Sequence, residues 1–374
     1  MQIFKLNILY VEPFYSGSHK QWIDAYKKYS NHDIHILDLP GKKWKWRMHG
    51  GAITLAEKFN NLNKKFDLII CSDMLNLPVF KSLCNKALLP NKIILYFHEN
   101  QLSYPWSPFD KDIELKRDLH YHYINYTSSL VSDYNFFNSS YHLQSYIEDV
   151  KKYLNKMPDF QNKDTVNKII KKSDVLSIGC ELTKYEKIKK EIKSPIILWN
   201  HRWEYDKNPD LFFKILMELY DDNIKFSLIV LGEKNKEYPE IFDIAIKKLK
   251  NRIIHFGYCD SYSEYMSYIR LSNILPVTSI QDFFGISIVE AVSCGNIPIL
   301  PNRLSYPEIL DFDKNENLFY ENEKELKNKL IYIINNISNL TSEIKNLSNS
   351  VYTNYSWDVI SKKYDDIFES ILTN

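Results

Sequence analysis

The sequence predicts an α/β protein of two Rossmann-like domains that face each other across a cleft. Short apolar runs of strand length alternate with helical patterns along the chain, which is typical of parallel sheets with right-handed crossovers. The 374 residues exceed what one hydrophobic core usually supports, and the alternation restarts after a highly charged segment at residues 184–193. We therefore expect domains at residues 1–183 and 194–356, with the charged segment as a linker or a solvated helix between them.

The first domain contains six apolar runs that we expect to be strands, at residues 6–12, 33–39, 67–71, 92–97, 134–137 and 174–180. A helical stretch places Trp22, Ile23 and Tyr26 on one face. Further helices are expected over residues 52–59, over 111–131 and from Tyr141. Two connections are expected to be loops, at residues 13–19 and, with a basic composition, at 41–51.

The second domain repeats the pattern, with strands expected at residues 196–199, 227–232, 252–256, 274–277 and 298–300. Its helices are expected to begin at Pro209, Pro239 and Ser263, and another covers 286–294. A final helix at residues 357–372 follows far beyond the last of these strands. We expect this third segment, 357–374, to cross back and pack on the first domain.

Composition and charge favour a cytoplasmic globular protein. The net charge is +1, so no general field attracts nucleic acid and any basic patch must be local. The five cysteines are scattered without a CxxC pair, which indicates core thiols in a reducing compartment. The N-terminus lacks the pattern of a signal peptide, and no apolar run approaches the roughly 18 residues of a membrane span. We expect no stable membrane insertion.

The stretch from Gln281 to Gly295 predicts a binding site for a nucleotide-sugar. It comprises an acidic loop after a strand, a turn at Gly285 and then a helix. The free N–H groups of a helix start favour phosphate. The carboxylates of Asp282 and Glu290 lie near that helix start and are good acceptors for sugar hydroxyls.

Two cations follow the first strand of the second domain, Arg202 and Lys207, just before the helix at Pro209. Their guanidinium and ammonium groups suit a diphosphate and would stabilise it as a leaving group. Taken alone they are more often part of a solvated loop. Together with Asp282 and Glu290 they favour a diphosphate site.

R-x4-K followed by the acidic pair in DFFGISIVEAVSCG resembles the retaining GT-B glycosyltransferases of the family 4 type. The resemblance implies that Arg202 and Lys207 hold the donor diphosphate and that Glu290 holds the nucleotide ribose. It also implies that the transferred sugar is met by Asp282, Phe284, Gly285 and Ile286. The family usually has Glu at the position of Asp282. No protein nucleophile and no cofactor are implied.

A narrower resemblance covers nearly the whole chain. The blocks ILYVEPFYSGSHKQ, LPGKKWKWR, ILYFHENQLSYP, FFNSSYH and LSYPEIL are similar to those of the tRNA-queuosine mannosyltransferases. The resemblance implies transfer of mannose from GDP-mannose to the cyclopentenediol of queuosine. The expected partners are therefore a nucleotide-sugar donor and a tRNA anticodon stem-loop, and the oligomeric state is not indicated.

The basic block at residues 41–47 interleaves cations with aromatic rings, as sites for single-stranded RNA do. We expect acceptor contacts from Lys42, Lys43, Trp44, Trp46 and Arg47. The alternative is an amphipathic segment with its tryptophans buried.

The loop after the first strand supplies further candidates. Gly17 would let the backbone approach the donor, and Tyr15 and His19 would contact the acceptor. His98 ends a strand of the same sheet, where it would contact the transferred sugar or have a structural role.

We expect no metal. Asp110-Lys-Asp112 and Asp311-Phe-Asp313 match the DxD signature, but 47 acidic residues make chance matches expected. His120 and His122 are two apart in a helical stretch and point in different directions. Two other functions remain open, a GT-B transferase acting on a cell-surface glycan and a non-catalytic RNA-binding protein on a transferase scaffold.

Overall fold

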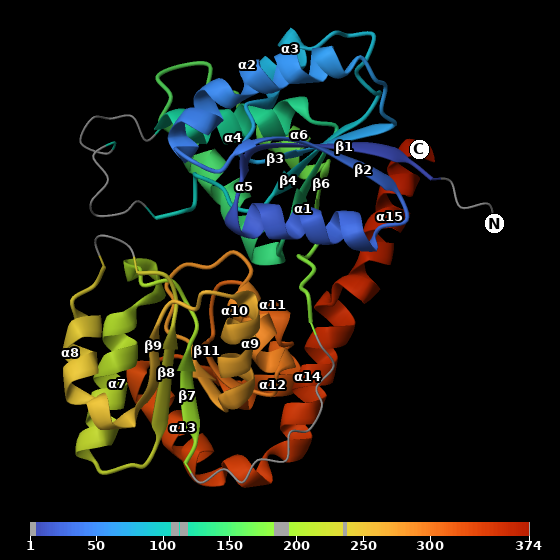
Figure 1. Ribbon diagram of the computed structural model, residues 1–374. Coiled ribbons are helices and arrows are strands. Elements are labelled where there is room, and N and C mark those ends of the chain that lie inside the picture. Colours follow the sequence, from blue (N-terminus) through green and yellow to red (C-terminus); the bar gives the residue numbers. More distant parts are fainter. Residues whose placement is uncertain (1–4, 106–111, 113–118, 183–193, 235–237, 374) are drawn as a thin grey trace. The chain divides into compact units, whose positions relative to one another are not determined.

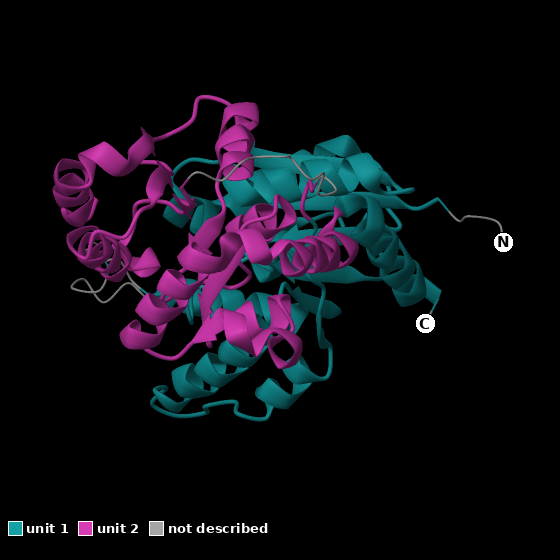
Figure 2. Cartoon of the chain, turned by 90° about the horizontal axis from the view of Figure 1, so that it is seen from below, with its two compact units in different colours: residues 1–179, 357–374 teal, residues 180–356 magenta. Residues whose placement is uncertain are grey.

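The structure is a computed structural model that describes residues 5–105, 112, 119–182, 194–234 and 238–373 (Figure 1). The chain divides into two compact units (Figure 2). Unit 1 contains residues 1–179 and 357–374, and unit 2 contains residues 180–356. The charged segment expected to be a linker, 184–193, lies outside the described residues.

Unit 1 is a parallel sheet with helices on both faces (Figure 1). Its elements in chain order are β1 (Asn7–Tyr15), α1 (Gly17–Tyr29), β2 (Asp33–Pro40), α2 (Trp44–Leu62), β3 (Leu68–Ser72), α3 (Leu77–Leu83), β4 (Ile93–Phe97), α4 (Leu119–Val131), β5 (Tyr134–Phe137), α5 (Ser140–Asn155), α6 (Thr165–Ile170), β6 (Ser173–Val175) and, from the end of the chain, α15 (Trp357–Thr373). The six described strands pair in the order β2-β1-β3-β4-β5-β6.

The two faces of this sheet follow from the two-residue period of its strands. Odd-numbered residues of β1, such as Leu9 and Val11, belong to the core cluster beneath α2, α3 and α5. Even-numbered residues point to the other face, where the ring of Tyr10 lies 5.3 Å from that of Trp22 on α1. The same alternation on β4 places Tyr96 against Trp22, at 4.5 Å between ring centroids.

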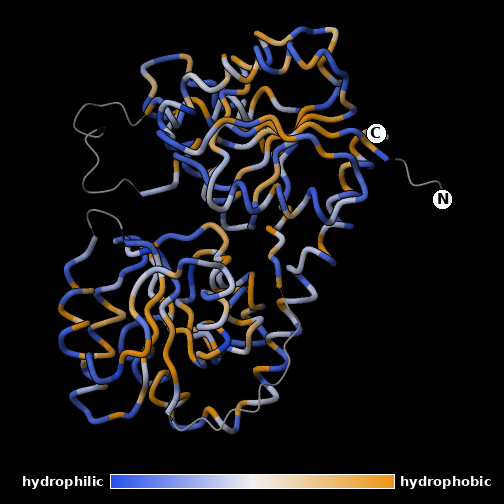
Figure 3. Tube along the Cα trace, in the orientation of Figure 1, coloured by the Kyte–Doolittle hydropathy of each residue, from blue (hydrophilic) through white to orange (hydrophobic). Residues whose placement is uncertain are grey.

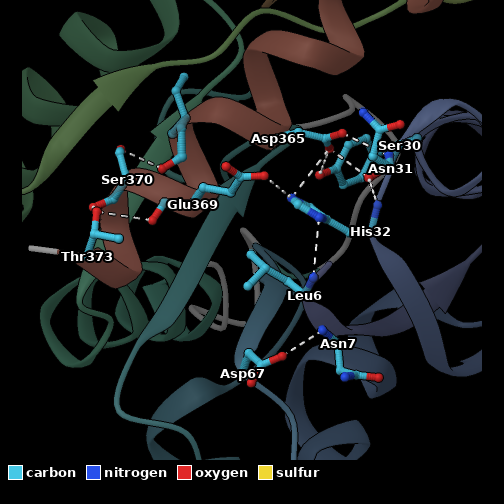
Figure 4. Close-up of polar contacts among 12 residues, drawn as sticks. Leu6, Asn7, Ser30, Asn31, His32, Asp67, Asp365, Glu369, Ser370 and Thr373 are labelled. Atoms are coloured by element: carbon cyan, nitrogen blue, oxygen red, sulfur yellow. Dashed lines mark hydrogen bonds and ion pairs between the residues drawn. The ribbon is translucent and has the colours of Figure 1, made fainter. Parts of the chain in front are cut away.

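The C-terminal helix α15 is fixed to this second face by aromatic and polar contacts. Tyr364 accepts a hydrogen bond from the Trp22 indole at 3.2 Å and donates one to the carbonyl of Ser177 at 2.7 Å. Asp365 is buried, and its carboxylate accepts a hydrogen bond from Tyr26. It also accepts hydrogen bonds from Ser30 and from the backbone of Asn31 (Figure 4). These donors offset the cost of burying the charge.

Unit 2 has the same plan (Figure 1). Its elements are β7 (Ile196–Trp199), η1 (Tyr205–Lys207), α7 (Pro209–Asp221), β8 (Ser227–Leu231), α8 (Ile241–Lys248), η2 (Lys250–Arg252), β9 (Ile253–Gly257), α9 (Tyr262–Leu271), β10 (Ile274–Pro276), α10 (Ile286–Ser293), β11 (Ile297–Pro301), α11 (Tyr306–Ile309), α12 (Phe312–Asn315), η3 (Glu316–Leu318), β12 (Phe319–Tyr320), α13 (Glu323–Asn336), η4 (Ile337–Asn339) and α14 (Thr341–Tyr355). The described strands pair in the order β12-β11-β10-β7-β8-β9. Hydrophobic residues concentrate along the strands of each unit (Figure 3).

Three local expectations were wrong. Residues 41–51 are not one loop, because α2 already begins at Trp44, and Trp44 and Met48, one turn apart, both pack into a cluster with Tyr121. The loop at 13–19 is shorter than expected, so His19 lies in the first turn of α1. The strand expected at 174–180 ends at Val175, and the chain then passes beneath Trp357, whose ring would lie 2.4 Å from a Cβ at Gly179.

Among the described residues no helix is both long and apolar enough to cross a membrane. Four of the five cysteines are buried, and all five are free thiols.

Candidate functional site

The candidate donor site lies at the carboxyl end of the unit 2 sheet, where the direction of strand succession reverses. β8 and β9 continue from one side of β7, whereas β10 pairs with its other side. Ligands of open parallel sheets bind at such a reversal. The loops after β7 and β10 carry Arg202, Lys207 and Asp282, so the topology brings these distant residues to one edge.

Lys207 and Asp282 lie close together in this edge. The Lys207 ammonium is buried, 3.2 Å from Oδ2 of Asp206 and 3.7 Å from Oδ2 of Asp282. It also donates to the carbonyl of Gln281 at 2.8 Å. Asp282 accepts a further hydrogen bond from the hydroxyl of Tyr306 at 3.3 Å. A bound diphosphate would take one of these places around the ammonium.

Arg202 has a different environment. Its side chain is 54% exposed, and Nη1 lies 3.2 Å from Oε1 of Glu204. The guanidinium is therefore accessible to a phosphate.

Helix α10 begins at this edge without a side-chain cap. Its N-cap is Gly285, at φ 103°, where only glycine is unstrained. Ser287 in the first turn is held by the loop after β7, because its carbonyl accepts from Asn200 at 2.8 Å and its hydroxyl lies 3.1 Å from Nδ1 of His201. The first-turn N–H groups of Ile286 and Ser287 are thus fixed at the edge, where they suit an anion.

The structure restricts what Phe284 can do. Its side chain is buried and packs edge-on against Tyr355 at 5.4 Å, so only its backbone could meet a ligand. Ile286 is half-buried. Asn200 and His201 were missed in the sequence, where nothing distinguishes them from other polar residues after a strand.

Glu290 is half-buried on α10 and accepts hydrogen bonds from two tyrosines of α9. Tyr262 donates to Oε1 at 3.3 Å and Tyr265 to Oε2 at 2.9 Å. Burial raises the pKa of Glu290 to about 6, although both tyrosine hydrogen bonds act in the opposite direction. The spacing of Tyr262 and Tyr265, three residues apart on one helix face, was a signal that could have identified them.

The candidate acceptor-side residues gather at the carboxyl end of the unit 1 sheet. Here too the strand succession reverses, because β1 lies between β2 and β3. His98 follows β4, Asp73 follows β3, and His19 lies in the helix after β1. Lys42 and Lys43 follow β2 and are exposed.

A buried polar cluster joins β1, the start of α1 and the end of β4. Glu12 is fully buried, and its Oε2 lies 3.0 Å from Nδ1 of His19. The imidazole rings of His19 and His98 are 4.3 Å apart between centroids. The hydroxyl of Tyr10 lies 3.1 Å from Nε2 of His98. Glu12 was missed in the sequence, where it appeared only as the polar end of an apolar strand.

The atoms of Glu12, His19 and His98 that could bind a metal lie within 4.8 Å of one another. The Glu12–His19 contact is however a hydrogen bond of 3.0 Å, which an inserted ion would have to break. We therefore interpret the group as a hydrogen-bonded cluster. That the protein works without a metal stays a prediction.

Tyr15 and Gly17 differ in how available they are. The hydroxyl of Tyr15 donates to Asp24 on α1, and Lys20 lies over its ring at 4.9 Å. Gly17 begins α1 at φ 51°, and a Cβ there would meet nothing within 4 Å. The backbone at Gly17 is therefore open to a ligand.

The basic aromatic block divides into packed and exposed residues. Trp44 is half-buried and its ring lies 5.1 Å from that of Tyr121. Arg47 donates to the carbonyl of Pro40 at 3.1 Å, and Lys45 pairs with Asp112 at 2.5 Å. Trp46, by contrast, is 64% exposed. Within this block, Lys42, Lys43 and Trp46 are therefore accessible to a ligand, whereas Trp44, Lys45 and Arg47 are engaged in contacts within the protein.

Comparisons with known proteins agree with this arrangement. The family model described as tRNA-queuosine alpha-mannosyltransferase N-terminal matches residues 7–180, and the model described as Glycosyl transferases group 1 matches residues 183–349. A tRNA-queuosine alpha-mannosyltransferase from Drosophila melanogaster is 33% identical over 384 aligned residues, covering 98% of each chain.

Solved structures share the fold at low identity. A sucrose-phosphate synthase from Thermosynechococcus elongatus has a TM-score of 0.74 and 12% identity, covering 99% of this chain and 100% of the other. Anabaena HepE in complex with UDP has a TM-score of 0.66 and 14% identity, covering 98% and 100%.

Two parallel six-stranded sheets with these matches define a glycosyltransferase of the GT-B fold. The similarity over 98% of the chain to a tRNA-queuosine alpha-mannosyltransferase identifies the family within this class. The chain belongs to the tRNA-queuosine alpha-mannosyltransferase family.

Proposed function

We propose that the protein transfers mannose from GDP-mannose to the cyclopentenediol of queuosine in a tRNA anticodon, with retention of configuration and without a metal. The observation that carries this proposal is the 33% identity to a tRNA-queuosine alpha-mannosyltransferase over 98% of both chains. The geometry of each unit supports this proposal separately. Unit 2 has a sheet edge suited to bind a diphosphate, and unit 1 has an exposed surface of cationic and aromatic residues.

In unit 2, Lys207, Arg202 and the start of α10 would hold the donor diphosphate. As the bond from the anomeric carbon to the phosphate oxygen breaks, negative charge grows on that oxygen. A cation and fixed N–H groups at this point stabilise the transition state more than the ground state. Lys207 is suited to this role because its contacts with Asp206, Asp282 and Gln281 hold the ammonium in one place.

Glu290 and Asp282 would accept hydrogen bonds from the ribose and from the transferred sugar. Glu290 must be ionised to accept from two ribose hydroxyls while it accepts from Tyr262 and Tyr265. Asp282 has a shorter side chain than the Glu of related enzymes, and its carboxylate contacts Lys207 and Tyr306.

The chemistry needs no protein nucleophile. The acceptor hydroxyl of queuosine attacks the anomeric carbon on the face that the diphosphate leaves, and its proton passes to the departing phosphate oxygen. One carbon–oxygen bond forms as another breaks, and the configuration is retained because the hydroxyl attacks from the same face that the diphosphate leaves. The structure of unit 1 supports acceptor binding there, since Lys42 and Lys43 can meet phosphate and Trp46 can stack on an unpaired base. Its substrate would place the enzyme in the cytoplasm.

The test combines purified protein with GDP-mannose and a tRNA that does or does not carry queuosine. We expect transfer of one hexose only to the queuosine-containing tRNA, giving an α-linked product by NMR. UDP-glucose and UDP-galactose serve as alternative donors. If the protein transfers sugar from UDP-glucose or UDP-galactose in preference to GDP-mannose, that nucleotide-sugar is the donor instead. Absence of both transfer and donor hydrolysis would support the non-catalytic alternative.

A further inference from the structure

We propose that Glu12 is a positioning residue for two histidines at the carboxyl edge of the unit 1 sheet. It holds His19 as a cation, and through Tyr10 it sets His98 as a hydrogen-bond acceptor toward a hydroxylated ligand. In this arrangement Glu12 and Tyr10 act on the ligand only through the histidines.

The strand period explains why these groups meet. Tyr10 and Glu12 are two apart on β1, and Tyr96 and His98 are two apart on and just after β4. Both pairs therefore point to the face of the sheet that α1 covers. His19 lies in the first turn of α1, directly above the ends of these strands.

Four hydrogen-bond contacts surround the carboxylate of Glu12. Oε1 accepts from the backbone of Phe14 at 2.8 Å and from the hydroxyl of Ser72 at 3.0 Å. Oε2 accepts from Tyr10 at 3.2 Å and faces Nδ1 of His19 at 3.0 Å. Hydrogen bonds to a charged acceptor are the strongest in proteins, and they replace the water that burial removes.

His19 is cationic because of this carboxylate. Burial lowers the pKa of His19, but the charge and the hydrogen bond of Glu12, with added charge from Asp73 and Glu99, outweigh burial and raise it to about 9. These acidic groups face the ring from β1 and from the ends of β3 and β4. Nδ1 of His19 thus carries the hydrogen that Glu12 accepts.

His98 is neutral for the opposite reason. Burial, then the neighbouring His19 cation and then His142 of α5 lower its pKa well below the usual value. A neutral imidazole carries one ring hydrogen, so its position decides what the ring can bind.

Tyr10 decides that position. Burial, and then the charge of Glu12, raise the pKa of Tyr10, so it keeps its one proton. The carboxylate of Glu12 attracts that proton more strongly than a neutral imidazole does. The Tyr10 oxygen is then left to accept from Nε2 of His98 at 3.1 Å. Nδ1 of His98 is left as a bare acceptor, and it is buried without a hydrogen-bond partner among the described residues.

A buried acceptor without a donor is costly, and a ligand hydroxyl would satisfy it. Beside it lies the fixed cation of His19. The edge therefore suits a hydroxylated ligand that carries or develops negative charge nearby. Identifying this ligand as the transferred sugar rests on the proposed function, but the state of the two histidines does not.

NMR of the full-length protein labelled with ¹⁵N-histidine tests the histidines without any substrate. His19→Gln and His98→Gln assign the two signals. We expect His19 to titrate at about 9, compared with about 6.5 for an ordinary histidine. We expect His98 to stay neutral with hydrogen on Nε2. A His19 midpoint at or below about 6.5 in the parent would overturn the proposal, whatever the variants do.

Glu12→Gln then tests the cause. The amide preserves the shape and the acceptor for Phe14 and Ser72, but it places an NH₂ group before His19. We expect the His19 midpoint to fall below neutral. A midpoint at or below about 7 would leave at most about one tenth of His19 protonated at pH 8, compared with about nine tenths in the parent, whose midpoint is about 9. Transfer at pH 8 should then be at least about tenfold lower than in the parent and should recover as the pH is lowered toward 6.

Two matched variants separate this role from packing. Glu99→Gln removes a carboxylate near the same ring but no hydrogen bond to it, so the His19 midpoint should fall less and transfer should stay near the parental rate. Tyr10→Phe should leave His19 near its parental midpoint and change only the tautomer signal of His98. If Glu12→Gln lowers the melting temperature but leaves the pH–rate profile unchanged, Glu12 is structural and the proposal is wrong. If the parent titrates as expected but transfers no sugar, the proposed function fails and the positioning role stands.

Discussion

Replacing Gly50 with alanine would separate RNA binding from folding at the exposed face of α2. Gly50 lies one turn after Trp46 in the middle of the helix, where glycine is less favourable than alanine by about 0.5–1 kcal/mol. A Cβ at Gly50 would lie 2.7 Å from Cζ2 and 2.9 Å from Cε2 of the Trp46 ring. The six-membered ring of Trp46 therefore lies directly against the glycine.

The magnitudes favour displacement of the ring over damage to the helix. Trp46 is 64% exposed, so its ring can rotate away from the new methyl group without disturbing a core. Gly50→Ala should then stabilise folding or leave it unchanged. If the ring stacks on an unpaired base, losing its position should cost about 1–3 kcal/mol of RNA affinity, roughly 5- to 150-fold in Kd.

The assay is a fluorescence titration of a queuosine-containing anticodon stem-loop into the full chain, with melting temperature measured alongside. Trp46→Ala should weaken binding as Gly50→Ala does. Leu62→Ala is the matched control, because it removes another exposed apolar side chain, 48% exposed, at the far end of the same helix. Parental affinity in both Trp46→Ala and Gly50→Ala would refute the stacking role of Trp46.

The other predictions concern the donor site and the metal. Arg202→Ala and Lys207→Ala should each cost about 2–4 kcal/mol of transition-state stabilisation. Only Lys207→Ala should also lower the melting temperature, because the Lys207 ammonium lies beside the buried Asp206. Unchanged turnover in both variants would show that these two residues do not hold the diphosphate. Donor affinity, measured by calorimetry, should fall as the pH drops through about 6, where Glu290 becomes protonated. Glu290→Gln should abolish that pH dependence. A donor affinity of the parent protein that does not change with pH would exclude Glu290 as the acceptor for the ribose hydroxyls. Activity should survive EDTA; loss restored by manganese would show that a metal is required.

Much of the fold was predictable because both sheets are parallel and buried. Strands such as β4 and β7 are continuous apolar runs, and α7, which follows β7, has a clear apolar face with Phe212, Leu216 and Leu219 buried. Where the sequence misled, tertiary packing outweighed local pattern. The helix start at Trp44 follows a left-handed Lys43, and it is fixed by contacts with Tyr121, far along the chain.

The donor motif could be identified from its spacing, whereas the residues that hold it could not. Arg202 and Lys207 stand out as charges after a strand, and Glu290 as a charge in the apolar helix α10. Glu12 does not, because its importance comes from donors contributed by separate strands and a helix. Similarly, the aromatic block suggested equal roles for Trp44 and Trp46, and only their packing separates them.

Mass spectrometry of tRNA nucleosides from cells with the protein, without it, and with the Arg202→Ala variant tests whether the protein glycosylates queuosine. We expect queuosine carrying one hexose only with the parent protein, and accumulation of unmodified queuosine in the other two. Release of that hexose as mannose would complete the assignment. Equal amounts of hexosylated queuosine in cells with and without the protein would contradict it.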